Sequence, residues 1–141
     1  MMFLPDVNLW LALAVESHIH HAAAVTWFET VSNDDCLFCR MTQQGFLRLV
    51  TNPKAIGEDA VSLPQAWLIY DALIRDPRVA FAREPGGIEP LWRSYTARES
   101  FSAKIWNDAY LAAFARAAGF QMVTFDRGFA QFANLDCTIL P

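Results

Sequence analysis

The chain opens with MMFLPDVN at residues 1–8, a short apolar run that ends in the carboxylate of Asp6. The run has too few residues for a helix and enough for a buried strand, whereas residues 9–15, LWLALAV, have helical character. Pro5 fits the last position of such a strand, because proline has no amide hydrogen to donate to a neighbouring strand. The stretch therefore predicts the first strand and helix of an α/β sheet. Ligands of open α/β sheets bind at the carboxyl ends of the strands, which is where Asp6 would lie.

Strand and helix patterns then alternate to the end of the chain. Strands are expected at residues 36–39, 79–82, 121–125 and 137–140, and helices at residues 22–31, 62–75, 89–98 and 103–118. A further helix is expected with Thr42 as its N-cap, Gln43 as its first residue and Asn52-Pro53 as its stop. Residues 54–61 are expected to form a polar loop. Strands that alternate with helices favour parallel pairing through βαβ crossovers.

The size of the chain fits a single domain, residues 1–141. Hydrophobic residues make up 54% of it and include five tryptophans and eleven phenylalanines, an excess that suggests that a partner covers part of the apolar surface. No apolar run approaches the roughly 18 residues of a membrane span, and no basic stretch precedes the apolar amino terminus as in a secretory signal. We therefore expect a cytoplasmic protein that does not enter a membrane.

The net charge of −4 argues against non-specific binding to nucleic acid. A polyanionic substrate would need metal ions and local arginines to supply positive charge. Three cysteines cannot all pair, and their spacing is unlike that of a disulfide framework, which fits a reducing compartment.

Two clusters of potential metal ligands have ordinary structural explanations. His18, His20 and His21 lie in a break between helices, with no cysteine or acid at the spacing of a zinc site. They are interpreted as a polar helix start in which one histidine is packed or hydrogen-bonded. Cys36 and Cys39 form C-x-x-C, but residues three apart on a strand point to opposite faces, which favours buried thiols over a shared metal.

Three acids lie in an unusual, apolar context. Asp6 and Asp126 each end an apolar strand and precede a helix-like segment, so both belong at the same edge of a parallel sheet. Asp108 lies among apolar and aromatic residues early in the helix over residues 103–118. Taken singly, Asp6 and Asp126 could be N-caps and Asp108 could interact with a helix dipole. Taken together, three carboxylates at one edge would raise one another's pKa values, and a divalent cation would remove that conflict.

Oxygen ligands with no nearby His or Cys favour Mg²⁺ or Mn²⁺ over zinc. A carboxylate-held Mg²⁺ polarises a phosphoryl oxygen and can lower the pKa of a bound water until it attacks. No Ser, Cys or Lys is marked as a covalent nucleophile, and neither G-x-x-x-x-G-K nor G-x-G-x-x-G is present. Hydrolysis by a metal-activated water is therefore the reaction class that these residues favour.

Four segments resemble the signature blocks of PIN domains, and most closely those of the VapC-type ribonuclease toxins of bacterial toxin–antitoxin pairs. They are LPDVN at residues 4–8, TQQGFLRL at residues 42–49, NDAYLAA at residues 107–113 and TFDRGF at residues 124–129. The four blocks occur in the family's order and together cover nearly the whole chain. The resemblance implies a three-layer, Rossmann-like α/β fold with a parallel sheet of about five strands flanked by helices.

The resemblance also implies Mg²⁺- or Mn²⁺-dependent cleavage of single-stranded RNA, a homodimer, and a small antitoxin protein that blocks the site. By position, Asp6, Asp108 and Asp126 match the family's acidic residues that hold the metal and carry catalysis. Asn8 and Thr124 match polar residues that support the first and the last of these acids.

Gln43 stands where most PIN domains have glutamate. Its amide oxygen still offers a ligand or a water contact but removes one negative charge. We therefore expect one tightly held ion and a second that is weaker or arrives with the substrate phosphate. Arg40, Arg48, Lys104 and Arg127 are the basic residues nearest to the four blocks, and they are candidates for RNA contacts or for ordinary ion pairing.

Two other hypotheses remain open. Gln43 and the acidic net charge are compatible with a PIN-like RNA- or protein-binding module that has little or no activity. A phosphatase or phospho-acceptor domain with an aspartyl nucleophile is less favoured. The second Asp of an Asp-x-Asp pair is replaced by Asn8, and no lysine follows the last strands.

Overall fold

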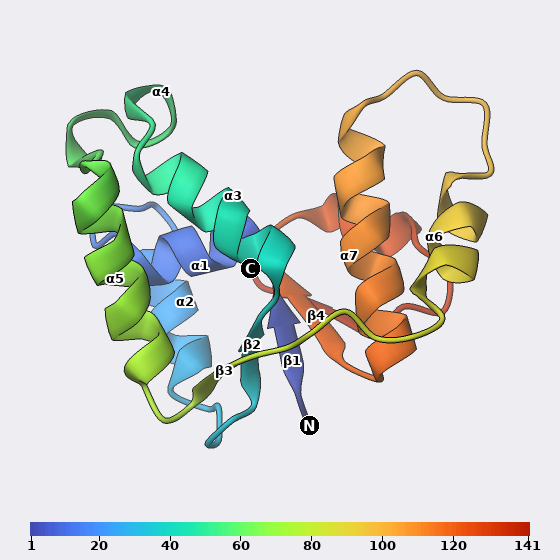
Figure 1. The fold of residues 1–141 in the computed structure, drawn as a ribbon, viewed down its shortest axis with the longest axis horizontal. Helices are drawn as coiled ribbons and strands as arrows, with labels where there is room; N and C mark the ends of the chain where they lie inside the picture. Colours follow the sequence, from blue (N-terminus) through green and yellow to red (C-terminus); the bar gives the residue numbers. More distant parts are fainter.

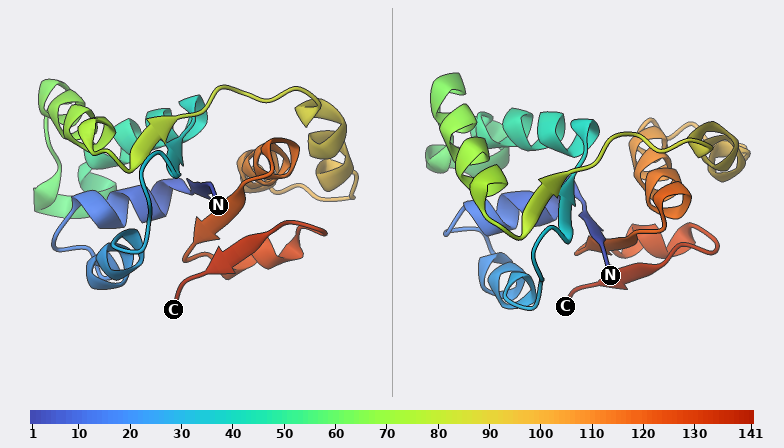
Figure 2. Two further views of the ribbon diagram at one scale, coloured as in Figure 1. Left: turned by 90° about the horizontal axis from the view of Figure 1, so that it is seen from below. Right: turned by 60° about the horizontal axis from the view of Figure 1, so that its bottom comes forward.

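Five parallel strands form one sheet in the computed structural model, which describes all residues from 1 to 141 (Figure 1). The strands are β1 (Phe3–Pro5), β2 (Cys36–Phe38), β3 (Val79–Phe81), β4 (Gln121–Thr124) and β5 (Cys137–Ile139). Their order is β3-β2-β1-β4-β5, so β1 lies in the middle and pairs with both β2 and β4. Figure 2 shows β3 and β5 at the two outer edges. The five-stranded parallel sheet expected from the sequence is confirmed.

Seven α-helices and two 3-10 helices join the strands. They are α1 (Val7–Ala14), α2 (His21–Phe28), α3 (Arg40–Val50), α4 (Pro53–Ile56), η1 (Gly57–Asp59), α5 (Leu63–Arg75), α6 (Ile88–Thr96), α7 (Lys104–Ala118) and η2 (Arg127–Gln131). The helices expected from the apolar patterns are present, with ends that differ slightly from the expected ones.

The helices cover both faces of the sheet. Successive residues of a strand point to opposite faces, so residues in register on neighbouring strands share a face. Leu4 of β1 and Met122 of β4 are in register and belong to a buried cluster with residues of α6 and α7. On the opposite face, Phe38 of β2 stacks on Trp10 of α1, with 3.7 Å between ring centroids, in a cluster with α3 and α5. Figure 1 shows α1, α2, α3 and α5 to one side and α6 and α7 to the other, as expected for three layers.

The strand order reverses its direction next to β1. From β1 the chain crosses to β2 and then to β3 on one side, and it later returns to β4 and β5 on the other. At such a reversal the connections that leave the two central strands diverge to opposite faces, and ligands bind in the crevice between them. The fold therefore places the residues that follow β1 and β4 at the binding edge of the sheet.

The expected start of the helix near residue 42 is wrong. α3 begins at Arg40, and its N-cap is Cys39 and not Thr42. The reason is a reciprocal cap, because the Thr42 hydroxyl accepts a hydrogen bond from the Cys39 amide at 2.9 Å. Thr42 thus stabilises the helix start from inside the first turn. Gln43 consequently lies deeper in the helix than expected.

The polar loop expected at residues 54–61 is also wrong, because α4 and η1 fill most of it. Asn52 is the N-cap of α4, and its side-chain oxygen accepts a hydrogen bond from the Lys54 amide at 3.0 Å. Pro53 then occupies the first helical position, where its missing amide hydrogen costs nothing. The Asn-Pro pair therefore ends α3 and starts the next short helix.

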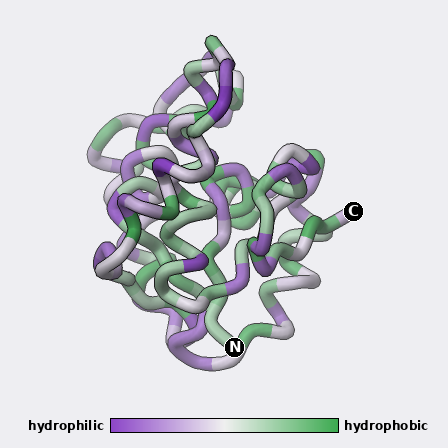
Figure 3. Tube along the Cα trace, turned by 90° about the vertical axis from the view of Figure 1, so that its right-hand side faces the viewer, coloured by the Kyte–Doolittle hydropathy of each residue, from purple (hydrophilic) through white to green (hydrophobic).

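Hydrophobic and hydrophilic residues alternate in short bands along the Cα trace (Figure 3). Such banding is expected of helices that bury one face against a sheet. None of the helices combines the length and the apolar character needed to cross a lipid bilayer. Cys36 and Cys39 are both buried, as expected, and they belong to hydrophobic clusters on opposite faces of the sheet.

Candidate active site

Asp6 lies directly after β1 and is only 5% exposed. It is the N-cap of α1, and its Oδ1 accepts a hydrogen bond from the Leu9 amide at 3.0 Å. Its Oδ2 accepts a hydrogen bond from the Thr124 hydroxyl at 2.5 Å. A helix start and the neighbouring strand therefore hold this carboxylate in one orientation.

Thr124, the buried last residue of β4, connects Asp6 to a second acid. Its hydroxyl donates to Asp6, and its oxygen accepts a hydrogen bond from the Asp126 amide at 2.9 Å. Asp126 is itself the N-cap of η2, with its Oδ1 accepting from the Gly128 amide at 2.8 Å. Both acids at the strand ends are thus N-caps, and the same threonine contacts the carboxylate of Asp6 and the backbone amide of Asp126.

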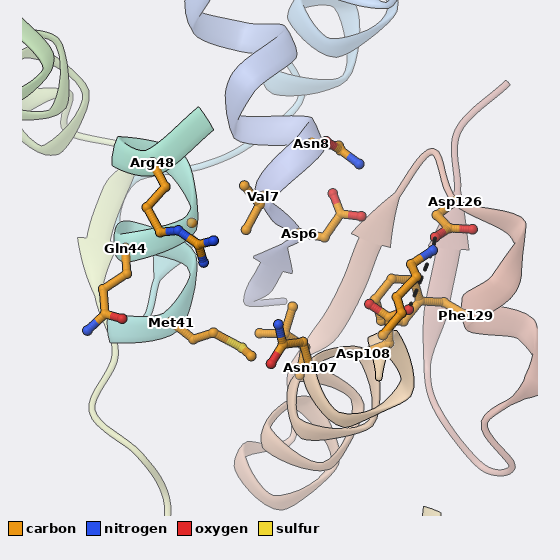
Figure 4. Close-up of a pocket in the computed structure, with 13 residues that line it drawn as sticks. Asp6, Val7, Asn8, Met41, Gln44, Arg48, Asn107, Asp108, Asp126 and Phe129 are labelled. Carbon is orange, nitrogen blue, oxygen red and sulfur yellow. Dashed lines mark hydrogen bonds and ion pairs between the residues drawn. The ribbon is translucent and has the colours of Figure 1, made fainter. Parts of the chain in front are cut away.

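The third acid, Asp108, lies on α7 one turn after Lys104. The Lys104 ammonium is 3.0 Å from Oδ2 of Asp126 and 3.7 Å from Oδ2 of Asp108, so one cation pairs with two acids (Figure 4). The side chain of Asp108 is 18% exposed and that of Lys104 is 70% exposed. A largely exposed cation therefore lies over two partly buried carboxylates.

The three acids line one cavity of about 400 Å³ at the carboxyl ends of β1 and β4. The polar side chains that line it are Asp6, Asn8, Gln44, Arg48, Lys104, Asn107, Asp108 and Asp126. Figure 4 shows Asp108 and Asp126 on the side of β4 and α7, Gln44 and Arg48 of α3 across from them, and Asp6 in between. The fold therefore brings together acids from three distant parts of the chain, facing a wall that contains an arginine.

Burial is the main influence on the pKa values of Asp6 and Asp108, whereas hydrogen bonds dominate at Asp126. It raises the pKa of Asp6 to about 6, and the nearby carboxylates of Asp126 and Asp108 act in the same direction. Burial also raises the pKa of Asp108. The pKa of Asp126 is lowered by the hydrogen bond from the Gly128 amide and by Lys104. Desolvated carboxylates of like charge favour the binding of a proton or a cation.

The sequence matches the PIN domain over residues 3–135. The chain belongs to the PIN domain family. Ribonuclease VapC41 of Mycobacterium tuberculosis is 42% identical to this PIN domain over 144 residues, which cover 99% of each chain. Ribonuclease VapC38 of the same organism is 38% identical over 132 residues, which cover 90% of this chain and 86% of the relative.

Crystal structures of VapC proteins have the same fold as this PIN domain. The crystal structure of Mycobacterium tuberculosis VapC20, described as a toxin that cleaves the sarcin–ricin loop, matches with a TM-score of 0.70 and 15% identity over 99% of each chain. VapBC2 from Rickettsia felis, bound to a promoter DNA fragment, matches with a TM-score of 0.71 and 11% identity over 100% of each chain. At these identities the similarity supports the PIN fold alone.

Most of the residues expected at the site of this PIN domain lie together. Asp6, Asn8, Asp108 and Asp126 line the cavity, and Thr124 supports Asp6 from the end of β4. Of the basic candidates, Arg48 and Lys104 line the cavity, and Arg40 and Arg127 do not. The guanidinium carbon of Arg40 lies 4.9 Å from the centre of the Phe81 ring.

Gln43 does not line the cavity of the PIN domain. It is 7% exposed, and its Oε1 accepts a hydrogen bond from the Arg40 guanidinium at 2.5 Å. Its exposed neighbour Gln44 lines the cavity instead. The early start of α3 explains the difference, because it shifts the residues that point toward the end of β1.

Three features of the cavity were not expected from the sequence. They are the lining residues Gln44 and Asn107 and the pairing of Lys104 with two acids. Residues four apart lie on the same side of a helix. This spacing relates Gln44 to Arg48 and could have identified Gln44 as a lining residue. It also relates Lys104 to Asp108 and could have identified their pairing. No comparable signal marks Asn107.

The oxygen donors of this cavity fit a hard divalent cation, because three carboxylates and the amide of Asn8 face it. In the present arrangement no three Asp, Glu, His or Cys side chains are close enough together to hold a metal ion. The ammonium of Lys104 supplies the positive charge between Asp108 and Asp126. Since that side chain is mostly exposed, its movement away from the acids disturbs little packing.

Proposed function

We propose that this PIN domain is a metal-dependent endoribonuclease that hydrolyses the phosphodiester bonds of RNA. The observation that carries the proposal is the gathering of Asp6, Asp108 and Asp126 around one cavity at the reversal of the strand order. Two relatives that are 42% and 38% identical over most of the chain are named ribonucleases. Identity of this extent supports the same reaction for this chain.

Asp6, Asp108 and Asp126 would hold Mg²⁺ or Mn²⁺, with the amide oxygen of Asn8 as a further donor. When bound, such an ion supplies Lewis-acid activation of the phosphodiester and of a water molecule. The protein's own part is to hold the acids ready. The hydroxyl of Thr124 and the first turn of α1 fix the Asp6 carboxylate before any ion binds. Preorganised ligands of this kind avoid a cost of ordering at the time of reaction.

The positive charge that RNA requires is local in this protein. The net charge is −4, but Arg48 of α3 and Lys104 of α7 line the cavity from different sides. Contacts from arginine and lysine to phosphate fix the position of a nucleic acid without reading its sequence. Once Lys104 leaves Asp126, its ammonium can pair with an RNA phosphate.

Replacing a single acid tests the activity. Asp6→Asn and Asp108→Asn are each expected to abolish RNA cleavage in the presence of Mn²⁺, and to abolish growth arrest when the protein is expressed in bacteria. Glu58→Gln, in exposed η1, is the matched control and is expected to cleave as wild type does. Mapping the cleavage ends on total RNA identifies the substrate. Cleavage by either Asp variant at the wild-type rate, with the fold intact, would refute the proposal.

A second candidate function is a binding module with little or no activity. It is favoured by the pairing of Lys104 with two of the three acids. Titration of Mn²⁺ during incubation with total RNA separates the two functions. Cleavage that grows with metal supports the nuclease, and its absence at saturating metal supports the module.

We further propose that the protein acts in the cytoplasm as a homodimer that a small antitoxin neutralises. Three large apolar side chains of α5, Leu63, Trp67 and Leu68, are more than half exposed and offer a surface for a protein partner. The free thiols fit a reducing compartment. Light scattering of the purified protein tests the dimer. Co-purification with the product of a small neighbouring gene, and loss of cleavage in that complex, test the antitoxin.

A further inference from the structure

A second hollow, which we call the histidine hollow, adjoins the acidic cavity. It measures about 310 Å³ and is lined by Asn8, His18, His20, Phe125 and Asp126. Asn8 and Asp126 also line the acidic cavity, so the two spaces meet along these side chains. A group bound in the histidine hollow therefore lies beside the place where the phosphodiester would react.

Aromatic rings form one side of the histidine hollow. The His20 ring lies nearly parallel on the Phe125 ring, with 4.3 Å between centroids and 13° between planes. The His18 ring follows, with its centroid 5.8 Å from that of His20. Phe125 directly precedes Asp126, so the stacked rings are linked to the acidic cavity through one peptide bond.

Hydrogen bonds hold the histidine segment in place. The His20 amide donates to Nδ1 of His18 at 3.0 Å, so the proton of neutral His18 is on Nε2. Burial, together with His20 and His21, lowers the pKa of His18, which favours the neutral form. Nδ1 of His21 lies 2.7 Å from the Ala12 carbonyl oxygen and fastens the segment to α1. The expected helix start with a hydrogen-bonded histidine is confirmed, and two of the three rings face a hollow in addition.

The chemistry of the histidine hollow favours a neutral aromatic group over a phosphate. No lysine or arginine lines it, and the carboxylate of Asp126 at its border repels anions. Rings of His and Phe stack with any nucleobase, because every base has a π-face. The Nε2–H group of His18 adds a donor that the edge of a base can accept.

We propose that the histidine hollow binds the base of a nucleotide next to the cleaved phosphodiester bond, with that base stacked on the pair of rings that His20 and Phe125 form. The proposal rests on the proposed ribonuclease activity, and it names the residues that position the substrate and select single-stranded RNA. A base is free to enter such a hollow only where it is unstacked, in single strands, loops and bulges. Double-stranded RNA would be excluded from productive binding.

Binding to RNA tests the proposal in the Asp108→Asn background, which prevents cleavage. The affinity is measured by fluorescence anisotropy with a labelled single-stranded RNA that spans a cleavage site, or with a mixed-sequence RNA if no site is found. His20→Ala is expected to weaken binding about 5- to 150-fold, the loss of one base–aromatic stack. His20→Phe keeps a ring and is expected to restore most of the affinity. Ile19→Ala, 89% exposed and outside the hollow, is the control and binds as the parent does.

An abasic scan locates the bound base. RNAs that lack a single base at successive positions are compared on the parent and on His20→Ala. On the Asp108→Asn parent, removal of one base beside the cut is expected to weaken binding by the same factor as His20→Ala does. On the protein that also carries His20→Ala, removal of the same base is expected to have no further effect. In the active protein the same substitution is expected to raise KM much more than it lowers kcat.

Three outcomes would overturn the proposal. One is that the parent and folded His20→Ala bind intact RNA with equal affinity. This outcome would refute the base site even if the Asp6→Asn variant shows that the protein is a ribonuclease. Another is an abasic scan without any sensitive position. The third is weaker antitoxin binding by His20→Ala with unchanged RNA binding, which would assign the hollow to a protein side chain. Circular dichroism melts check folding, and Phe125→Leu replaces His20→Ala if the latter does not fold.

Discussion

Lys104 occupies the same carboxylates that are proposed to hold a divalent cation. Its ammonium lies 3.0 Å from Asp126 and 3.7 Å from Asp108, and its side chain is 70% exposed. A metal ion bound to these carboxylates would repel the ammonium, so we expect an incoming ion to displace it. Ion pairs that are partly exposed contribute only about 0.2–1 kcal/mol. The lysine is therefore a weak competitor that shields the acids from one another until metal arrives.

Lys104→Met should strengthen metal binding, because the competing ammonium is removed while the aliphatic chain is kept. We expect the dissociation constant for Mn²⁺, measured by isothermal titration calorimetry, to fall about 2- to 5-fold. Lys54→Met removes the only other lysine, which is exposed and does not line the cavity, and serves as the control. Weaker Mn²⁺ binding by Lys104→Met would mean that this lysine orients the acids and does not compete for them.

At the scale of residues, the sequence predicted the position of those site residues that directly follow a strand. Asp6 and Asp126 could be placed because each follows an apolar strand, and the structure has both at one cavity. Gln43 and Gln44 could not be distinguished, because the side of a helix that a residue faces depends on where the helix begins. The reach of Lys104 to Asp126 across 22 residues depends on how α7 sits over the sheet, which no local pattern encodes.

Among the elements, α3 and α1 lie close to each other at Gly45. A Cβ atom built on Gly45 would lie 2.6 Å from Cγ2 of Val7, and Val7 directly follows Asp6. Gly45→Ala should therefore push α3 away from α1. Crowding of this kind costs about 1–3 kcal/mol, which outweighs the gain of up to about 1 kcal/mol from the better helix propensity of alanine. We expect a net loss of about 1 kcal/mol in the free energy of unfolding, measured with urea, and slower RNA cleavage.

Two further variants isolate the clash at Gly45. Gly86→Ala adds the same methyl group where no atom lies within 4 Å, and should change stability by less than about 0.5 kcal/mol. Val7→Ala removes the atom that is hit, so Gly45→Ala should cost less in that background than in wild type. Additive losses in the double variant would exclude the proposed contact.

The turn between α5 and β3 is held by a second charge pair, Asp76 with Arg78. The guanidinium donates to both carboxylate oxygens, at 2.9 Å and 2.8 Å, and lies 3.8 Å from the centre of the Phe28 ring. These contacts join the edge of the sheet to α2. The hydrogen bonds from Arg78 lower the pKa of Asp76 in the folded protein.

Since the folded protein binds the proton at Asp76 less tightly than the unfolded chain does, the pair stabilises the fold above the unfolded pKa of about 4. That contribution is lost as the pH falls through the lower, folded-state pKa. Asp76→Asn should thus lower the free energy of unfolding by about 1 kcal/mol at pH 7. In urea unfolding experiments below about pH 4, the loss should become progressively smaller. Glu89→Gln breaks a pair whose side chains are 68% and 78% exposed, and should have little effect at pH 7. A loss at Asp76→Asn that is independent of pH would exclude the charge pair as its cause.

At the scale of elements, the helices and strands could be located because their apolar patterns are long or sharply bounded. The start of α3 could not, since a cysteine N-cap supported by Thr42 is not among the usual capping residues. α4 has only four residues, so its formation depends on the single cap at Asn52, which no longer pattern announces.

For the whole molecule, alternating strands and helices were enough to predict a parallel sheet, but not the order of its strands. β1, β2, β3 and β5 each contain three residues, too few to encode which neighbour they choose. The order β3-β2-β1-β4-β5 follows from how the helices between them pack on the two faces. The reversal beside β1 then makes the acidic cavity a property of the topology and not of any single segment.

The cavity also predicts how stability depends on metal. Burial raises the pKa of Asp6 to about 6, and two other carboxylates act in the same direction, so the charge on Asp6 opposes folding when no metal ion is bound. An ion that binds only the folded protein stabilises it by about 2.7 kcal/mol at a concentration 100 times its dissociation constant. For a chain of this size, Mn²⁺ should therefore raise the Tm by about 5–15 °C relative to EDTA. Asp108→Asn, which removes a ligand and a repelling charge, should show little or no shift, and Glu58→Gln should shift as wild type does. An undiminished shift in Asp108→Asn would locate the bound ion outside the cavity.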